Sequence, residues 1–289
     1  MMHAPLDCFA AASEAGLNSS RLEKLSQVAR TAAELGGTVL MQHYGRLDSI
    51  QQKSRAGDLV TNADLAAEAA VLESLQAATS NIPVLAEESG SSGDTTGLCW
   101  CVDPLDGTTN FAHGYPFFAT SVGLLWLDQP ILGAIAVPFL KELFWCCPGV
   151  GAYLHDQRIT VSDCKTLEDS LLVTGFAYDR RELEDNNYAE FCRLTHHTHG
   201  VRRGGAAAVD LAYVAAGRLD GYWERGLSPW DLTAGAALVV MAGGRVSDYK
   251  APAYSVGTGR ILATGPALHG QLQAELDTCL LYTSPSPRD

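Results

Sequence analysis

The sequence predicts a mixed α/β fold in which helices cover the faces of mixed β-sheet. Three observations carry this prediction. Apolar residues recur at helical spacing near the start of the chain, continuous apolar runs typical of buried strands follow, and helix and strand signals alternate in the second half. The 289 residues suffice for one large domain, or for two packed halves with a well-buried core.

The first half combines two helices with hairpin-like strands. Residues 1–18 show no clear periodicity and are expected to form a loose N-terminal arm. A capping-box pattern begins a helix at Ser20, Gly45 ends it, and a second helix starts near Asp64. Strand-like segments follow at 82–86, 98–102, 117–127, 131–137 and 142–146. We therefore expect an N-terminal α+β half over 19–160 with an antiparallel sheet.

The second half, residues 161–277, has the alternating character of an α/β arrangement. Gly217 and Gly243 each follow a predicted helix, as is common at helix ends. Strands are expected at 170–175, 219–223, 245–247 and 261–264, and helices at 188–195, 206–216, 232–242 and 268–276. Residues 278–289 end in Ser-Pro-rich sequence and are expected to be disordered or a tail foreign to the fold.

Composition argues against several classes of partner. The net charge of −13 disfavours nucleic acid and anionic membranes, so neither is an expected partner. No apolar stretch is long enough to cross a bilayer, and Met1–Ala12 lacks the basic start of a secretory signal, so we expect a cytoplasmic protein. An acidic enzyme acting on phosphate would need local positive charge, for which bound metal ions are the usual source.

The sharpest chemical signal is the segment 102–111, Val-Asp-Pro-Leu-Asp-Gly-Thr-Thr-Asn-Phe. A buried strand delivers Asp103 at its end, and a turn can aim Asp106 into the same cavity. Closely held oxygen ligands are what Mg²⁺ prefers. Gly107 lets the backbone approach a ligand, and a helix starting at Thr108 would direct N–H groups at a phosphate. An ordinary Asp-Pro turn with a helix cap is the alternative explanation.

Each of the other acidic residues, taken singly, has an ordinary structural explanation. Asp64 completes a capping box with Thr61, Glu87 can be solvated surface charge at a strand end, and Asp231 can cap a helix. Together with the 102–111 segment, they indicate a shared metal site.

With these motifs the chain resembles the inositol monophosphatase family, within the lithium-sensitive, magnesium-dependent phosphatase superfamily. The signatures are 102–111 and 230–244, and the segments 58–64, 86–89 and 219–224 match in order and spacing. The resemblance covers roughly residues 20–276. It implies a layered α/β/α/β/α sandwich, usually assembled as a homodimer.

The resemblance also implies two or three Mg²⁺ ions. Glu87, Asp103 and the carbonyl of Leu105 resemble ligands of the first ion. Asp103, Asp106 and Asp231 resemble ligands of the second. Glu87 also resembles a contact, through water, to a third and weaker ion.

The remaining site residues follow from the same resemblance. Asp64 and Thr108, with Glu87, resemble the catalytic group that positions and activates water, and the amides of Gly107 and Thr108 resemble phosphate contacts. The positions that contact inositol hydroxyls in the family are occupied by Asp106, Gly205, Ala206 and Glu224. The implied reaction is magnesium-dependent hydrolysis of inositol 1-phosphate, a small phosphorylated polyol, to inositol and phosphate.

Three positions depart from the family pattern. Ala206 stands where Ser or Thr is usual, Met241 replaces a usual Glu, and Thr233 replaces a usual Ala. None of these is an implied metal ligand, so they bear on substrate preference more than on catalysis.

Alternative functions stay open at this point. Histidinol phosphate, fructose 1,6-bisphosphate or a 3′-phosphoadenosine phosphate could be the substrate. A bisphosphate would require an extra basic pocket, for which Arg202 and Arg203 are candidates, although helix-end salt bridges are their more common role. Some bacterial relatives resemble regulators of the RNA-synthesis machinery, a role that needs no metal ligands, whereas every ligand position is filled here.

Overall fold

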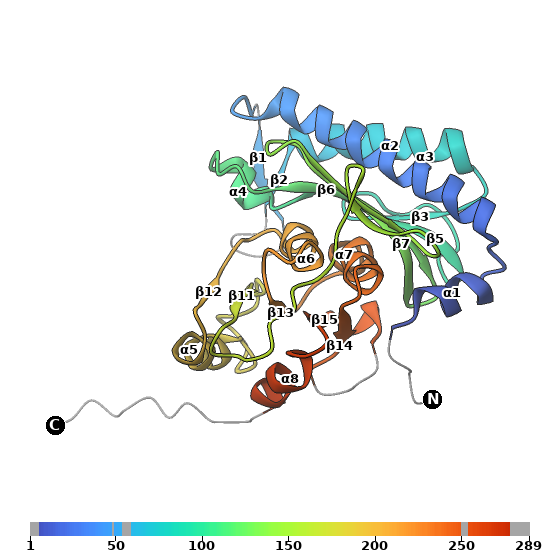
Figure 1. Cartoon of the computed structure of the whole chain (residues 1–289). Helices are drawn as coiled ribbons and strands as arrows, with labels where there is room; N and C mark the ends of the chain where they lie inside the picture. Colours follow the sequence, from blue (N-terminus) through green and yellow to red (C-terminus); the bar gives the residue numbers. More distant parts are fainter. Residues whose placement is uncertain (1–5, 48, 54–58, 250–253, 278–289) are drawn as a thin grey trace.

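The computed structural model describes residues 6–47, 49–53, 59–249 and 254–277. Helical and strand layers alternate in the order α, β, α, β, α (Figure 1). The helices are α1 (Cys8–Glu14), α2 (Ser19–His43), α3 (Asn62–Thr79), α4 (Thr108–Ala112), α5 (Tyr188–His197), α6 (Ala207–Ala215), α7 (Pro229–Met241) and α8 (His269–Asp277), with a 3₁₀ turn η1 (Val256–Thr258). The strands are β1 (Ile50–Gln52), β2 (Leu59–Thr61), β3 (Val84–Ala86), β4 (Gly90–Ser91), β5 (Leu98–Asp106), β6 (Ala119–Trp126), β7 (Gln129–Val137), β8 (Glu142–Cys147), β9 (Gly151–Leu154), β10 (Gln157–Arg158), β11 (Leu171–Thr174), β12 (Gly200–Arg202), β13 (Gly221–Arg225), β14 (Arg245–Ser247) and β15 (Arg260–Thr264).

The first half forms an eight-stranded sheet in the order β10-β9-β8-β7-β6-β5-β3-β4. Neighbouring strands are antiparallel except β3 and β5, which run parallel. Helices α2 and α3 cover one face, and α7 packs against the other (Figure 1). The predicted antiparallel character of this sheet is thereby confirmed for all pairs but one.

The second sheet has the order β12-β11-β13-β15-β14. Strand β11 lies parallel to both β12 and β13, whereas β15 is antiparallel to its neighbours. Helices α5 and α8 lie on its outer side, and α6 and α7 separate it from the first sheet (Figure 1). The mixed sheet with helices on both faces agrees with the predicted fold class.

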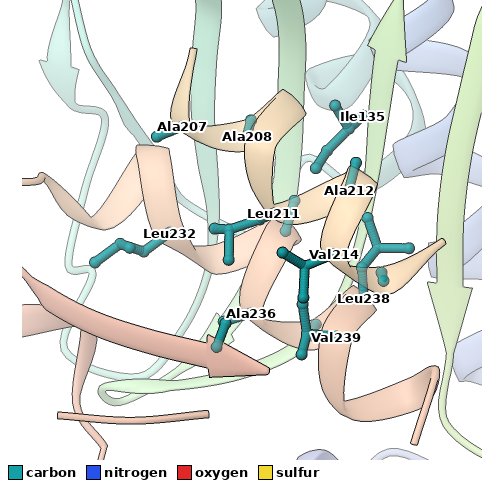
Figure 2. Packing of buried hydrophobic residues seen from close by; sticks show 14 of the residues in the cluster. Ile135, Ala207, Ala208, Leu211, Ala212, Val214, Leu232, Ala236, Leu238 and Val239 are labelled. Atoms are coloured by element: carbon teal, nitrogen blue, oxygen red, sulfur yellow. The ribbon is translucent and has the colours of Figure 1, made fainter. Parts of the chain in front are cut away.

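The middle layer depends on small residues that let helices approach closely. Figure 2 shows apolar side chains of α6 and α7 interdigitating, with Leu211 between the two helices. A Cβ added at Gly133 would lie 2.5 Å from Cβ of Ala234, and one at Gly235 would lie 2.5 Å from Cδ1 of Leu211. Each fully buried leucine contributes about 2 kcal/mol through the hydrophobic effect. This dense layer fixes the two sheets relative to each other.

The N-terminal expectation needs a correction. Residues 8–14 form helix α1 rather than a loose arm. Asp7 caps it by accepting hydrogen bonds from the amides of Phe9 and Ala10, and Cys8 is fully buried. Two turns of mostly small residues give too short a pattern for helical periodicity to be visible.

Some strands were not predicted, and the structure leaves two of the predicted domain bounds untested. Strands β1, β2, β4, β9, β10 and β12 were not anticipated, because two to four residues carry little alternation. The boundary at residue 160 stays a prediction, and the predicted 278–289 tail lies outside the described residues. In the described part of the chain, the helices are too short or too polar to span a membrane.

Candidate active site

A β-bulge brings Asp103 and Asp106 to the same side of β5. Asp103 pairs with Ser121 and Asp106 pairs with Ala119, so three steps along β5 match two along β6. In a regular strand, residues three apart point to opposite faces, and the extra residue of the bulge reverses that parity. The Asp-Pro-Leu-Asp spacing thus places two carboxylates together only because the strand is interrupted between them.

Two further acids join this pair from distant parts of the chain. One carboxylate oxygen each of Asp103, Asp106 and Asp231 lies within 4.8 Å of the others. Glu87 follows β3 and lines the same cavity as Asp103. Asp231 is in the first turn of α7, where its Oδ2 accepts a 2.7 Å hydrogen bond from the amide of Ser228. Ser228, not Asp231, is therefore the residue at the N-cap position.

Burial and mutual repulsion raise the pKa values of these acids. Burial is the largest cause for Asp106 and Asp231, whose pKa values rise to about 7. The pKa of Asp103 lies well above its usual range because of burial and the neighbouring charges of Glu87 and Asp106. The pKa of Glu87 is also raised, mainly by burial. Crowded carboxylates of this kind are stabilised when a cation lies among them.

The set of donors fits a hard divalent cation. Four carboxylates and the backbone carbonyl of Leu105, which lies beside the same cavity, are oxygen ligands of the kind that Mg²⁺ takes. No other group of three or more acidic, histidine or cysteine side chains with this closeness occurs in the described ranges.

Asp106 also connects the two halves. Its Oδ1 and Oδ2 accept hydrogen bonds from the amides of Ala207 (3.0 Å) and Ala208 (2.8 Å), in the first turn of α6. Ala206 occupies the N-cap position and has no hydroxyl to fill that role. The carboxylate of Asp106 therefore satisfies amides that a Ser or Thr cap would otherwise bind.

Gly107 is required by both conformation and space. Its φ of 91° is in the left-handed region, and an added Cβ would lie 3.1 Å from the carbonyl oxygen of Phe117 and 3.2 Å from Ala206. Helix α4 begins at the next residue, Thr108. The backbone at Gly107 and Thr108 thus lies close to α6, between the two halves.

Thr108 and Asp64 form a buried hydrogen-bonded pair. Oγ1 of Thr108 lies 3.0 Å from Oδ1 of Asp64 and 3.0 Å from the carbonyl oxygen of Leu105. Oδ2 of Asp64 accepts hydrogen bonds from the amide and hydroxyl of Thr61, which completes the capping box of α3. Burial raises the pKa of Asp64. The capping box uses Oδ2 of Asp64 and the contact with Thr108 uses Oδ1, so the structural explanation of this residue and its predicted catalytic role are compatible.

Glu224 lines the same cavity from β13, a strand of the second sheet. Oη of Tyr222 donates a 2.6 Å hydrogen bond to its Oε2. Burial raises the pKa of Glu224 to about 7, and the guanidinium of Arg203 opposes that rise.

These residues surround one cavity of about 420 Å³. It is lined by every predicted site residue except Asp64, which lies behind Thr108. The predicted residues on its wall are Glu87, Asp103, Leu105, Asp106, Gly107, Thr108, Gly205, Ala206, Glu224 and Asp231. The fold thus brings together segments up to 144 residues apart, although the roles of these residues stay predictions.

The cavity also contains residues that the sequence analysis did not single out. Lys53 donates hydrogen bonds to Glu87 (2.8 Å) and Glu88 (2.5 Å). Arg180 also lines the wall. Single basic residues such as these carry no sequence signal. Arg203, which the sequence analysis named with Arg202 as a candidate for a basic pocket, does line the cavity.

The chain is similar to known proteins over most of its length. Residues 21–281 match the Inositol monophosphatase family. The chain is 50% identical over 258 residues to an inositol-1-monophosphatase of Synechocystis, covering 89% of this chain and 90% of that protein. It is 40% identical over 248 residues to the Nus factor SuhB of Pseudomonas aeruginosa, covering 84% and 92%.

A solved structure shows the same architecture. An inositol monophosphatase from Anabaena (Nostoc) superposes with a TM-score of 0.82 at 49% identity, covering 88% of this chain and 96% of that one. The layered sandwich predicted from the sequence is therefore confirmed.

Proposed function

Because this chain belongs to the inositol monophosphatase family and is a phosphoric monoester hydrolase, we propose that it hydrolyses inositol 1-phosphate with Mg²⁺. The observation that carries the proposal is one cavity that is lined both by an acidic cluster and by Glu224. The cluster suits a cation that binds phosphate, and a carboxylate suits the hydroxyls of a polyol.

The acids would hold the metal in the proposed reaction. Glu87, Asp103, Asp106, Asp231 and the carbonyl of Leu105 are the proposed ligands. When bound, Mg²⁺ supplies charge neutralisation for the phosphate and the leaving oxygen, which is the main requirement of phosphoryl transfer. This local positive charge would also offset the repulsion between an acidic protein and an anionic substrate.

Thr108 and Asp64 would handle the proton of the attacking water. The hydroxyl oxygen of Thr108 accepts a proton from water while its own proton passes to Oδ1 of Asp64, 3.0 Å away. Because burial raises the pKa of Asp64, its carboxylate is a better proton acceptor than an exposed aspartate. The two hydrogen bonds from Thr61 keep that carboxylate oriented toward Thr108.

Water would attack phosphorus directly, without a phosphorylated side chain. A metal site combined with a Thr–Asp pair requires no cysteine or serine nucleophile. Trapping a phosphorylated residue by acid quench during turnover would contradict this part of the proposal.

A phosphate-release screen tests the substrate. Inositol 1-phosphate, histidinol phosphate, fructose 1,6-bisphosphate and 3′-phosphoadenosine phosphate are each supplied with and without Mg²⁺. We expect the highest kcat/KM for inositol 1-phosphate and no turnover after chelation. A clear preference for another ester would refute the proposed substrate and leave the enzyme class intact.

A regulatory role is the second candidate, because one relative is named a Nus factor at 40% identity. Capture of the transcription machinery from a bacterial lysate, compared between the parent and an inactive variant, tests it. Binding that is retained by the inactive variant, together with phosphatase activity in the parent, would indicate two roles. The expected homodimer, lithium sensitivity and cytoplasmic location stay predictions.

A further inference from the structure

Glu224 carries one hydrogen bond that the proposed reaction does not use. Tyr222 and Glu224 are two apart on β13, so both side chains point to the same face of the sheet. Oη of Tyr222 lies 2.6 Å from Oε2 of Glu224. Tyr222 is fully buried and does not line the cavity, whereas Glu224 does. The hydroxyl therefore acts on Glu224 from behind the site.

A glycine closes the other side of the same carboxylate. A Cβ added at Gly175 would lie 1.9 Å from Oε2 and 2.2 Å from Oε1 of Glu224, so any larger residue would displace the carboxylate. Gly175 follows β11, which runs parallel to β13 with Thr174 opposite Trp223. The carboxylate is thus confined between a hydroxyl and a backbone Cα.

Asn187 holds Gly175 in this position. Its Nδ2 donates to the carbonyl of Gly175 (2.7 Å) and to Oγ1 of Thr174 (2.7 Å), and its Oδ1 accepts from Nε1 of Trp223 (2.6 Å). These bonds join the ends of β11 and β13 directly beneath Glu224. The backbone against which the carboxylate rests is therefore fixed by buried hydrogen bonds.

The hydroxyl of Tyr222 makes the only hydrogen bond to this carboxylate among the described residues. Oε2 is thereby held, and the carboxylate keeps further acceptor positions at a residue that lines the cavity. A glutamate on a strand otherwise has several rotamers, and fixing one of them removes an entropic cost of binding. The positive charge of Arg203 lowers the pKa of Glu224, and the negative charge of Asp231 raises it.

We propose that Tyr222 is a positioning residue that, together with Gly175, fixes the carboxylate of Glu224 for binding substrate hydroxyls. Tyr222 thereby contributes to selection of polyol phosphates over esters without hydroxyls. The proposal rests on the proposed function, because it assigns Glu224 to the polyol side of the same cavity.

The test compares two substrates in four variants, namely Tyr222→Phe, Gly175→Ala, Glu224→Gln and the combination of Tyr222→Phe with Glu224→Gln. Tyr222→Phe removes only the hydroxyl and is expected to raise KM for inositol 1-phosphate about tenfold with kcat unchanged, as for loss of a hydrogen bond to a charged group. p-Nitrophenyl phosphate lacks polyol hydroxyls, so its KM and kcat should not change. Gly175→Ala should reproduce this pattern by displacing Glu224. In a Glu224→Gln background, Tyr222→Phe should add little, because the partner is already altered.

Tyr254→Phe is the matched control. Tyr254 is fully buried, and its hydroxyl has no hydrogen-bond partner in the described part of the chain. This variant should leave both substrates unaffected.

Other outcomes overturn the proposal. A Tyr222→Phe enzyme with unchanged KM for inositol 1-phosphate, equal losses on both substrates, or full additivity with Glu224→Gln would each refute it. If the parent enzyme hydrolyses p-nitrophenyl phosphate but not inositol 1-phosphate, the proposed function fails and the positioning role falls with it. Because failure of the proposed function would be seen in the parent enzyme alone, it can be distinguished from failure of the positioning role.

Discussion

Burial raises carboxylate pKa values in two parts of the cavity wall, the acidic cluster and Glu224, but different groups stabilise the ionised forms. In the cluster Glu87, Asp103, Asp106 and Asp231 crowd together, and their pKa values rise through burial and mutual repulsion. In the other part Glu224 is held by a neutral hydroxyl and a glycine. The crowded acids need a shared cation to be stable when ionised, whereas ionised Glu224 is stabilised by the hydroxyl of Tyr222 and the charge of Arg203. Perturbing the cluster should therefore affect turnover, and perturbing the surroundings of Glu224 should affect substrate choice.

The strongest test of this contrast is Asp106→Asn. We expect turnover to fall on the order of a thousand-fold or more for every ester, because a charged oxygen facing the cavity is lost. Asparagine keeps the side-chain shape and one acceptor for the amides of α6, so the fold should persist. Phosphate release measures the first effect, and circular dichroism measures the second.

Asp94→Asn is the control for that substitution. Asp94 is exposed and accepts hydrogen bonds from Thr96, away from the cavity. Substantial activity in the Asp106 variant would count against its assigned role, and a loss in the Asp94 variant would show that the assay is not specific.

A smaller effect is expected at the proton-transfer pair. Thr108→Val keeps the branched shape but removes the hydroxyl bonded to Asp64, so kcat should fall about a hundredfold as for loss of general-base assistance. KM should change little on either substrate. Thr79→Val is the control, because it also removes a buried hydroxyl, at the end of α3. It should lower thermal stability without changing kcat. Equal kcat losses in both variants would refute a catalytic role for Thr108.

The smallest expected effect is on stability. Folded-state pKa values of about 7 for Asp106 and Asp231 exceed the ordinary value of 3.8, so the contribution of these acids is present below about pH 4 and is lost as pH rises through 7. Bound Mg²⁺ favours the ionised acids and opposes this loss.

Melting temperatures with Mg²⁺ and with a chelator, at pH 6 and pH 8, measure this effect. Saturating Mg²⁺ should raise the melting temperature by several degrees at pH 8 and by less at pH 6. A larger shift at pH 6 would contradict the proposed acidic metal site. The Asp106→Asn variant should show a reduced shift at both pH values.

Much of the fold was predictable because long elements carry strong patterns. The capping box of Thr61 and Asp64 and the glycines after α6 and α7 predicted the helix ends within a few residues. Helix α1 and the strands of two to four residues were not predicted, because their patterns are too short. Lys53 and Arg180 were missed at the site because single basic residues in short segments have no distinguishing spacing.

The sequence by itself determined the alternation of helices and strands, the family, and which acids are candidates for the site. Those features depend on local periodicity and on motif spacing, which the chain carries in linear order. Only the tertiary structure decided that a bulge turns Asp103 and Asp106 to one side and that Asp106 bonds to α6. It also decided that Tyr222 and Gly175 confine Glu224. These contacts join residues as many as 102 positions apart, and they follow from strand register and close packing rather than from any local pattern.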